Sequence, residues 1–314
     1  MKSPPSLSII VPVFNEEDNV GVLYDEIRNS VDRLARIYEI IFVDDGSSDT
    51  TFERLKRVKE KEIQKGLGLV ETKIIRFSRN FGQTAAMQAG FDCSKGDLIV
   101  SLDADLQNDP RDIPRLLEKL DEGYDLVSGW RKDRKDKALT RIFPSKMANW
   151  LIRMITGVPI HDNGCSLRGY RSSVVKSIRL YSDMHRFIPA MTAIIGAKTG
   201  EIIVNHRPRR YGETKYGLSR IWKVLLDIIT MKMLIHFHHR PILWFAIFAF
   251  VCGFLGCLFG LTTIILFLKG NQSIVFSAVT FLSFFLFGSL LFWGLLAEFF
   301  IKIEKSVLPP INQK

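Results

Sequence analysis

The chain has 314 residues, a length that allows two domains, and carries a formal net charge of +10 with a pI near 9.4. This charge suits anionic lipid, phosphorylated substrates or nucleic acid as partners. The four cysteines form no CxxC and no disulfide spacing, which argues against a disulfide-stapled fold and agrees with a reducing compartment.

The first 130 residues alternate apolar strand segments with helical segments. Strands are expected at Leu7–Val11, Glu39–Val43, Lys73–Phe77, Leu98–Leu102 and Leu126–Val127. Helices are expected from the NEED segment at Asn15 to about Ala35, after Thr50, at Asn80–Ala89 and at Ile113–Leu120. Such alternation in short units predicts a parallel, doubly wound α/β sheet.

The pattern becomes less regular after Trp130. A charged run covers Arg131 to Lys137, and the following expected elements are helices at Ser145–Ile155 and Phe187–Ile195 and an edge strand at Glu201–Val204. Leu218–Phe237 is amphipathic and is predicted to lie in the membrane interface, although an ordinary domain helix has the same pattern.

Two uncharged segments near the carboxyl terminus predict a transmembrane hairpin. Residues 242–268 and 274–297 contain no charged side chain, and at a rise of 1.5 Å per residue each reaches about 36 to 40 Å. The alternative is a pair of helices buried in a soluble core. Lysine and arginine side chains flank the hairpin on the side of the chain ends, namely Lys223, Lys232, Arg240, Lys302 and Lys305. The positive-inside rule therefore places the large domain in the cytoplasm.

These features predict three regions: a catalytic domain at 1–217, a juxtamembrane helix at 218–240, and two transmembrane helices with a short tail at 241–314. The beginning of the chain shows no cleavable signal peptide. Membrane spans favour anionic lipid and phosphorylated substrates over nucleic acid as the partners of the positive charge, and association into homo-oligomers through the spans is reasonable.

The segment LIVSLDADLQND, Leu98 to Asp109, leads an apolar strand directly into two carboxylates. Asp103, Asp105 and Gln107 then lie at the carboxyl end of the strand, where open α/β sheets bind ligands. Hard oxygen ligands at this place suit Mg²⁺ or Mn²⁺ together with the phosphates of a nucleotide substrate. The alternative is that these carboxylates only cap a helix or solvate a loop.

Polar loops follow the first two strands at the same end of the sheet and predict a nucleotide pocket. Asp44, after the second strand, can accept a hydrogen bond from a base N–H, and Gly46 lets the backbone approach a ligand closely. No GxGxxG follows the first strand and the chain contains no GxxxxGK[ST], which argues against dinucleotide-binding and P-loop chemistry.

Four segments in this order, IIVPVFNEEDNV, VDDGSSDTT, RNFGQTAAMQAG and SLDADLQNDP, resemble the inverting family 2 glycosyltransferases with the GT-A fold. The later segments HDNGCSLRGY and RYGETKYGLSRIWK, with the hairpin, are similar to the polyisoprenyl-phosphate glycosyltransferases of that family. The resemblance covers nearly the whole chain. It implies a Rossmann-like, mostly parallel GT-A sheet followed by interfacial helices and a two-helix membrane hairpin.

The resemblance also implies roles for particular residues at the donor site. Asp44 would meet the base, Asp103 would lie beside the diphosphate, and Asp105 with Gln107 would bind the metal. The residues implied to line the nucleotide are Pro12, Asn15, Glu16, Asp44 and Asp103, and those implied for catalysis are Asp103, Asp105 and Gln107.

Other positions are implied for the acceptor and the sugar. The acceptor phosphate would bind Arg131, Arg141 and Ser145; a lid over the diphosphate would contain Arg210, Lys215 and Tyr216; and the sugar would border Asp162 and Arg168. Arginine suits phosphate because it is permanently charged and binds in a bidentate manner. The alternatives are solvated surface arginines beside the membrane and loop residues without a function.

The expected activity is the inverting transfer of one sugar from a nucleotide sugar, expected to be a UDP-sugar, to undecaprenyl phosphate or a similar lipid at the cytoplasmic membrane. A lipid phosphate is already an anion at neutral pH, so it needs no strong general base. The chain has no QxxRW motif, which favours a phosphate over a sugar hydroxyl as acceptor. The alternatives are transfer to a saccharide or protein hydroxyl, and a non-catalytic role in a membrane assembly.

Overall fold

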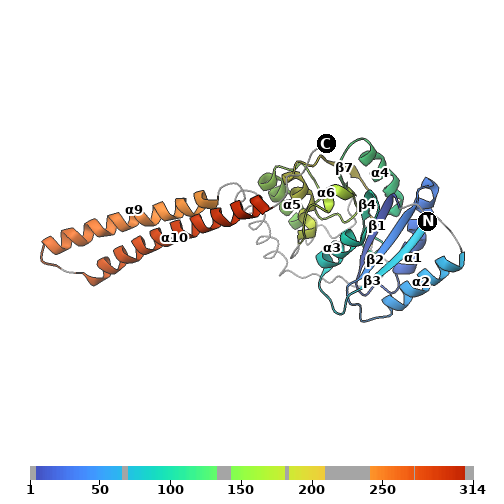
Figure 1. The fold of residues 1–314 in the computed structure, drawn as a ribbon, viewed down its shortest axis with the longest axis horizontal. Helices are drawn as coiled ribbons and strands as arrows, with labels where there is room; N and C mark the ends of the chain where they lie inside the picture. Colours follow the sequence, from blue (N-terminus) through green and yellow to red (C-terminus); the bar gives the residue numbers. More distant parts are fainter. Residues whose placement is uncertain are drawn as a thin grey trace. The chain divides into compact units, whose positions relative to one another are not determined.

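A computed structural model describes residues 5–65, 70–132, 143–180, 184–208, 241–271 and 273–307. The chain divides into two compact units, Met1–Ile228 and Ile229–Lys314, which are called the amino-terminal and carboxyl-terminal units below. Figure 1 shows the sheet of the amino-terminal unit and the two long helices of the other. The predicted interfacial helix at 218–237 lies outside the described residues.

The amino-terminal unit is built on a seven-stranded sheet with the order β3-β2-β1-β4-β6-β5-β7 (Figure 1). The strands are β1 (Leu7–Val13), β2 (Tyr38–Asp44), β3 (Val70–Arg76), β4 (Leu98–Ser101), β5 (Leu126–Trp130), β6 (Arg168–Arg171) and β7 (Thr199–Ile203). β1 pairs in parallel with both β2 and β4, and β2 pairs in parallel with β3. The carboxyl ends of these four strands therefore lie at one end of the sheet, which confirms the predicted parallel α/β architecture.

One strand was not expected from the sequence. β6 runs antiparallel between β4 and β5, with Val100 and Val127 both opposite Gly169. A Cβ atom on Gly169 would lie 3.0 Å from Leu120 Cδ1, so the strand passes directly under the helix that covers it. β7 pairs in parallel with β5, as the predicted edge strand requires.

Helices cover both faces of the sheet. The principal ones are α1 (Val20–Val31), α2 (Thr51–Lys65), α3 (Gln83–Cys93), α4 (Ile113–Asp121), α5 (Phe143–Thr156), α6 (Ser172–Val175) and α7 (Ile188–Ile194). Alternate residues of β1 face opposite layers: Ile9 packs in the core formed with α1, α2 and α4, whereas Ile10 packs in the core formed with α3, α6 and α7. The two apolar faces explain why β1 and β2 read as nearly continuous apolar runs.

Two helices begin later than predicted. α1 begins at Val20 rather than in the NEED segment, because Asn15 adopts a left-handed φ of 53° that a helix does not contain. α3 begins at Gln83 rather than Asn80, after Gly82 with a φ of 96°. In both places the residues before the helix form a loop at the carboxyl end of the sheet.

A buried ion-pair network lies at the opposite, amino end of the strands. Glu39 is 0% exposed and accepts hydrogen bonds from Ser8 Oγ at 2.6 Å and from the Lys95 backbone N–H at 2.6 Å. Its second oxygen lies 2.5 Å from Lys73 Nζ. Burial alone would raise the pKa of Glu39, but the bonds from Lys73, Ser8 and Lys95 outweigh it and hold the pKa below its ordinary value.

Glu39→Gln is expected to lower the free energy of unfolding by about 1.5–3 kcal/mol at pH 7, because it removes the charged acceptor of Lys73. The contribution of Glu39 is present above its unfolded pKa and is lost as the pH falls through its lower folded pKa. The difference in the free energy of unfolding between wild type and variant should therefore become smaller in acid. Denaturant unfolding at several pH values measures this difference. A difference that grows in acid would contradict an ionised Glu39 paired with Lys73.

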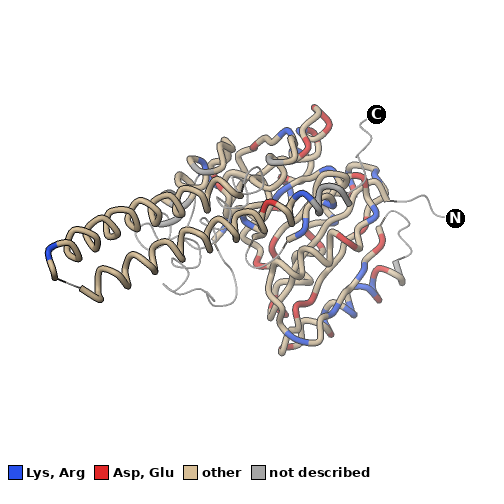
Figure 2. The backbone as a smooth tube through the Cα atoms, turned by 60° about the vertical axis from the view of Figure 1, so that its left-hand side comes forward, with Lys and Arg blue, Asp and Glu red and all other residues tan. Residues whose placement is uncertain are grey.

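The carboxyl-terminal unit consists of two long apolar helices, α9 (Pro241–Leu268) and α10 (Ile274–Val307). Figure 2 shows them almost entirely free of charged residues. Lys269 lies in the turn between them. Segments Pro241–Leu268 and Ile274–Lys302 are long and apolar enough to cross a membrane. The helices pack closely where glycines of α9 meet aromatic rings of α10: a Cβ atom on Gly253 would lie 3.0 Å from Phe287, and one on Gly256 would lie 3.2 Å from Phe284.

Candidate active site

The carboxylates of the D-x-D segment follow β4 at the carboxyl end of the sheet, as the sequence predicts. Leu102 N–H donates to Ile10 O at 3.2 Å, so the chain leaves the sheet immediately before Asp103. Asp105 Oδ1 accepts from the Gln107 N–H at 3.2 Å and is mostly buried. Asp103, Asp105 and Gln107 therefore lie on one tight loop, residues 102–109, which is called the D-x-D loop below.

Asp103 lies in a dense set of charged and polar groups. Its Oδ1 accepts from Gln83 Nε2 at 2.6 Å, and Ser166 also donates to its carboxylate. Burial and then the negative charge of Asp105 raise the pKa of Asp103 to about 6, while Ser166 and the positive charges of Arg131 and Arg168 act in the opposite direction. Two carboxylates thus lie close together, with Arg131 and Arg168 near enough to affect the pKa of Asp103.

This donor set fits a divalent cation that a substrate completes. Within the described residues no group of three or more His, Cys, Asp or Glu side chains forms a metal site made by protein alone. Mg²⁺ and similar ions are usually held by only one or two carboxylates together with substrate phosphates. Asp103 and Asp105 are close enough for one to raise the pKa of the other, so a cation bound to them would relieve their repulsion.

The loops after β1 and β2 form the second part of the site. Asp44 ends β2, is 0% exposed, and accepts from the Ser47 N–H through Oδ1 at 2.9 Å. Its Oδ2 lies 3.5 Å from Arg76 Nε and has no hydrogen-bond donor among the described residues. A buried carboxylate oxygen without a donor is costly unless a ligand or water supplies one.

Residues after β1 hold this loop in place. Asn15 N–H donates to Ser47 Oγ at 2.9 Å, and Asn15 Oδ1 accepts from the Ser48 N–H at 2.9 Å. Glu16 N–H donates to Thr51 Oγ1 at 2.9 Å. Pro12 lies in β1 opposite Val43. The residues predicted to line the nucleotide therefore come together around the carboxyl ends of β1 and β2.

Gly46 has a structural role in the contact between two loops, and its predicted close approach to a ligand stays a prediction. Its φ is +70°, and a Cβ atom there would lie 2.4 Å from the backbone carbon of Arg79. Gly46 thus allows two loops to touch. A surface depression of about 380 Å³ lies beside it, lined by Gly46, Ser47, Arg76, Phe77 and Ser78.

Arg131 and Asp162, predicted separately for the acceptor and the sugar, form one buried ion pair. Arg131 Nε donates to Asp162 Oδ2 at 2.7 Å and Nη2 donates to Oδ1 at 3.0 Å. The side chains are only 14% and 4% exposed. Burial alone would lower the pKa of Arg131, but the charge and hydrogen bonds of Asp162 outweigh it and raise the pKa. A guanidinium has five N–H donors, so this pairing is compatible with a further phosphate contact.

Arg168, the first residue of β6, is 2% exposed. It donates to Ser128 Oγ at 3.3 Å, to His185 O at 2.8 Å and to Asn163 O at 2.5 Å. The Nδ1 atom of His185 in turn forms a 2.8 Å hydrogen bond with Thr84 Oγ1. Burial and the charges of Arg186 and Arg168 lower the pKa of His185 to about 3, so its ring is neutral at pH 7.

The remaining predicted residues are not placed. Arg141 and the predicted lid residues Arg210, Lys215 and Tyr216 lie outside the described residues, and for Ser145 only the backbone in α5 is described. Sequence reasoning missed Gln83, Ser166 and His185, which surround Asp103 and Arg168. Gln83 lies in the RNFGQTAAMQAG segment, which was a signal for the family but not for this contact.

A family model described as glycosyl transferase family 2 matches residues 8–179, a range that begins in β1 and includes the D-x-D loop and β6. The chain belongs to glycosyl transferase family 2. The resemblance inferred from the motifs is thereby confirmed, as is the assignment to the glycosyltransferases.

This family 2 glycosyltransferase is also similar to two curated proteins. It is 45% identical to a dodecaprenyl-phosphate galacturonate synthase of Rhizobium johnstonii, over 75% of this chain and 69% of that protein. It is 36% identical to an undecaprenyl-phosphate 4-deoxy-4-formamido-L-arabinose transferase of Edwardsiella ictaluri, over 96% of this chain and 90% of that protein. The second similarity includes the two long apolar helices.

Solved structures of low identity share the fold of this glycosyltransferase. A crystal structure of glucosyl-3-phosphoglycerate synthase from Mycobacterium tuberculosis with Mn²⁺, uridine diphosphate and phosphoglyceric acid has a TM-score of 0.54 at 17% identity, covering 74% of this chain and 78% of that one. The structure of that synthase with phosphoglyceric acid has a TM-score of 0.53 at the same identity. These likenesses confirm the predicted GT-A sheet architecture.

Proposed function

We propose that this glycosyltransferase transfers one sugar from a UDP-sugar to a polyisoprenyl phosphate, with inversion at the anomeric carbon, at the cytoplasmic face of a membrane. The observation that carries the proposal is that one chain contains both parts such an enzyme requires, a glycosyltransferase domain and an apolar helical hairpin. The similarity to an undecaprenyl-phosphate sugar transferase spans 96% of the chain, from the catalytic sheet through the apolar hairpin. The second curated relative is likewise named for transfer to a polyprenyl phosphate.

The donor is proposed to bind across the carboxyl ends of β1, β2 and β4. Asp44 Oδ2, which has no donor among the described residues, would accept from the base. The depression beside Gly46 is lined by Ser47 and Arg76, the two residues that contact Asp44. Asp103, Asp105 and Gln107 would hold a divalent cation. This cation, Mn²⁺ or Mg²⁺, would neutralise the departing nucleoside diphosphate. The structural neighbour bound to Mn²⁺ and uridine diphosphate supports this choice of donor and ion.

The acceptor phosphate is proposed to attack the anomeric carbon directly. A phosphate oxygen forms the new bond to the sugar, and the bond from the sugar to the nucleoside diphosphate breaks. No strong base is required, because a phosphate monoester is already ionised at neutral pH. The task of the protein is to align the phosphate, and Arg131, oriented by Asp162, is proposed to contact it from the wall beside Asp103. Arg141 and Ser145 are proposed to complete this contact, and Arg210, Lys215 and Tyr216 to cover the diphosphate.

The test is transfer with the full-length protein in detergent. Radiolabelled UDP-sugars, including UDP-galacturonate and UDP-glucose, are incubated with Mn²⁺ and either undecaprenyl phosphate, undecaprenol or a soluble saccharide. The proposal predicts label in the organic phase only with undecaprenyl phosphate and one of the donors. Label transferred to the saccharide, or equally to undecaprenol, would favour a hydroxyl acceptor instead and contradict the proposal.

Replacing Asp44 tests the proposed base contact. Asp44→Asn retains an oxygen for the Ser47 N–H but replaces one charged acceptor by an amide, so UDP affinity is expected to fall by about 10- to 100-fold. Titration calorimetry with UDP measures this, with pyrophosphate as the control ligand that lacks a base. An equal loss of affinity for both ligands would show that Asp44 does not contact the base.

A further inference from the structure

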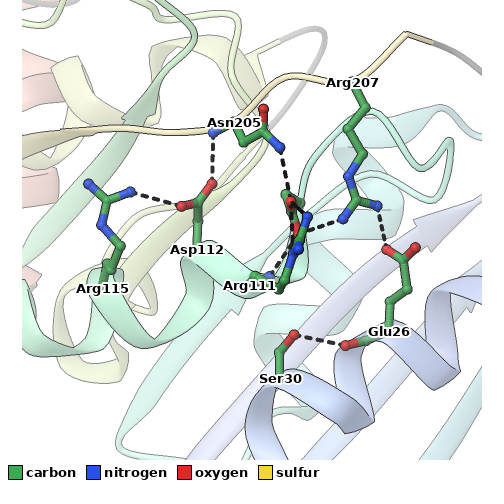
Figure 3. Close-up of polar contacts among 8 residues, drawn as sticks. Glu26, Ser30, Arg111, Asp112, Arg115, Asn205 and Arg207 are labelled. Carbon is green, nitrogen blue, oxygen red and sulfur yellow. Dashed lines mark hydrogen bonds and ion pairs between the residues drawn. The ribbon is translucent and has the colours of Figure 1, made fainter.

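A polar network beside the D-x-D loop joins three separate parts of the amino-terminal unit (Figure 3). At its centre Arg207 Nη2 lies 2.6 Å from Asp109 Oδ1, and Arg207 Nη1 lies 2.6 Å from Glu26 Oε2 in α1. Arg207 and Asp109 are 17% and 3% exposed in their side chains. Asp109 also accepts from Asn205 Nδ2 at 3.0 Å and from Arg111 Nη2 at 2.7 Å. Arg207 therefore connects α1 and the segment after β7 to the end of the D-x-D loop.

The backbone makes the same connection. Arg207 N–H donates to Gln107 O at 2.9 Å, and Asn108 forms an antiparallel bridge with His206. On its other side the loop is tied to the segment before β6, because Asn108 Nδ2 donates to Ser166 Oγ at 2.8 Å. Ser166 is also a hydrogen-bond partner of Asp103. Residues 107–109 are thus held between two segments that are remote in sequence.

These contacts hold a loop whose backbone conformation is unfavourable without support from the surrounding structure. Leu106, between Asp105 and Gln107, has a φ of 60° and is 1% exposed. A left-handed conformation is unfavourable for a leucine and persists only where the surrounding structure enforces it. Its buried side chain fixes one side of the loop, and the contacts of Arg207 fix the residues that follow.

We propose that Arg207, through its contacts with Asp109 and Gln107, is a positioning residue that holds the D-x-D loop in the conformation that binds a nucleoside diphosphate with its cation. The inference rests on the proposed function. Arg207 itself is not proposed to contact the substrate. Its removal is expected to weaken cation binding and turnover beyond any general loss of stability, because small displacements of groups that bind the reacting diphosphate are costly.

The first test is Arg207→Met with Arg115→Met as the matched control. Arg115, in α4, binds Asp112 at 2.9 Å and the Ile203 carbonyl at 2.9 Å, so it supports the end of β7. Among the described residues it forms no hydrogen bond or ion pair with residues 102–109. Arg207→Met is expected to raise the Mn²⁺ dissociation constant in the presence of UDP about tenfold and to lower kcat about 10- to 100-fold. Arg115→Met is expected to leave both within about twofold. Arg207→Lys, which keeps the charge, should restore part of each loss.

Free Mn²⁺ is measured by electron paramagnetic resonance, so binding is read independently of activity, and thermal unfolding is recorded for each variant. Wild-type Mn²⁺ affinity and kcat in Arg207→Met, or equal losses in Arg207→Met and Arg115→Met, would overturn the inference. If the wild type binds UDP and Mn²⁺ in an Arg207-dependent manner but transfers no sugar to undecaprenyl phosphate, the proposed function fails while the inference stands.

Hydrogen exchange on the wild-type protein tests the same coupling without a variant and decides the matter if Arg207→Met does not fold. Adding UDP with Mn²⁺ should slow exchange at the amides of residues 205–207 together with those of residues 106–109, since the two segments are bonded to each other. Protection confined to residues 106–109 would show that the segments respond separately and would overturn the inference.

Discussion

Asp105→Asn is expected to lower kcat for sugar transfer by at least about 10²-fold while the protein remains folded and inserted in the membrane. The change removes one negative charge from the pair of carboxylates on the D-x-D loop but keeps an oxygen that can accept from the Gln107 N–H. Charge stabilisation by a bound cation is worth several kcal/mol in the transition state. Weaker binding of the cation is therefore expected to cause a large loss of kcat. The transfer assay with undecaprenyl phosphate measures it.

The matched control is Asp121→Asn. Asp121 ends α4, is 54% exposed in its side chain and pairs with Arg36 at 3.0 Å, so its loss should leave kcat unchanged within about twofold. A second readout separates cation binding from folding: Asp105→Asn should weaken UDP binding in Mn²⁺ but not in metal-free buffer. Full turnover by Asp105→Asn would remove the D-x-D loop from the mechanism. Loss of turnover in an Asp105→Asn variant that inserts normally in the membrane would exclude a purely non-catalytic role in a membrane assembly.

Asp162→Ala is expected to lower the free energy of unfolding by about 3–5 kcal/mol, because it leaves the Arg131 guanidinium buried without its counterion. Urea unfolding followed by tryptophan fluorescence measures this loss. Arg131→Met should cost less, because Asp162 keeps the hydrogen bonds it accepts from the backbone N–H groups of Gly164 and of residue 131. Stability loss under about 1 kcal/mol for Asp162→Ala would show that the pair is solvated in solution.

The double variant Arg131→Met with Asp162→Leu separates the structural from the functional part of this pair. Replacing both charges by apolar side chains of similar size is often neutral for stability, so most of the loss should be recovered. If Arg131 also binds the acceptor phosphate, the stable double variant should still show a raised KM for undecaprenyl phosphate and an unchanged UDP affinity. Recovery of full activity together with stability would make Arg131 a structural residue only.

The parallel core of the fold was predictable because its signals are local. β1, β2 and β4 are buried on both faces, so each reads as a continuous apolar run, and each ends in polar residues at the carboxyl end of the sheet. The same reasoning placed Asp44 and Asp103 at that end. The family resemblance added the partners and roles that local patterns do not contain.

β6 was not predictable from its own residues. Its four residues, RGYR, have an arginine at each end, and the strand exists only because β4 and β5 provide partners on both sides. The buried Arg168 is accommodated by carbonyl oxygens from distant segments, His185 and Asn163. A short strand formed by long-range pairing carries little local signal.

The boundaries of the hairpin show a related limit. α10 continues to Val307, beyond the end of the uncharged segment at Ala297, because Glu298 and Lys302 lie four residues apart on the helix and pair at 3.6 Å. The contact between Arg131 and Asp162 could not be predicted from the sequence either, because the two residues are 31 positions apart. The sequence indicated both residues for different tasks, and only the fold shows that they touch.

The most direct test of the proposed donor site is a cryo-electron microscopy structure of the full-length protein in a lipid nanodisc with UDP and Mn²⁺. This site requires the diphosphate and the ion at the D-x-D loop, with Asp103 or Asp105 within coordination distance of the ion and the base beside Asp44. A nucleotide bound elsewhere, or an ion that contacts neither carboxylate, would contradict it.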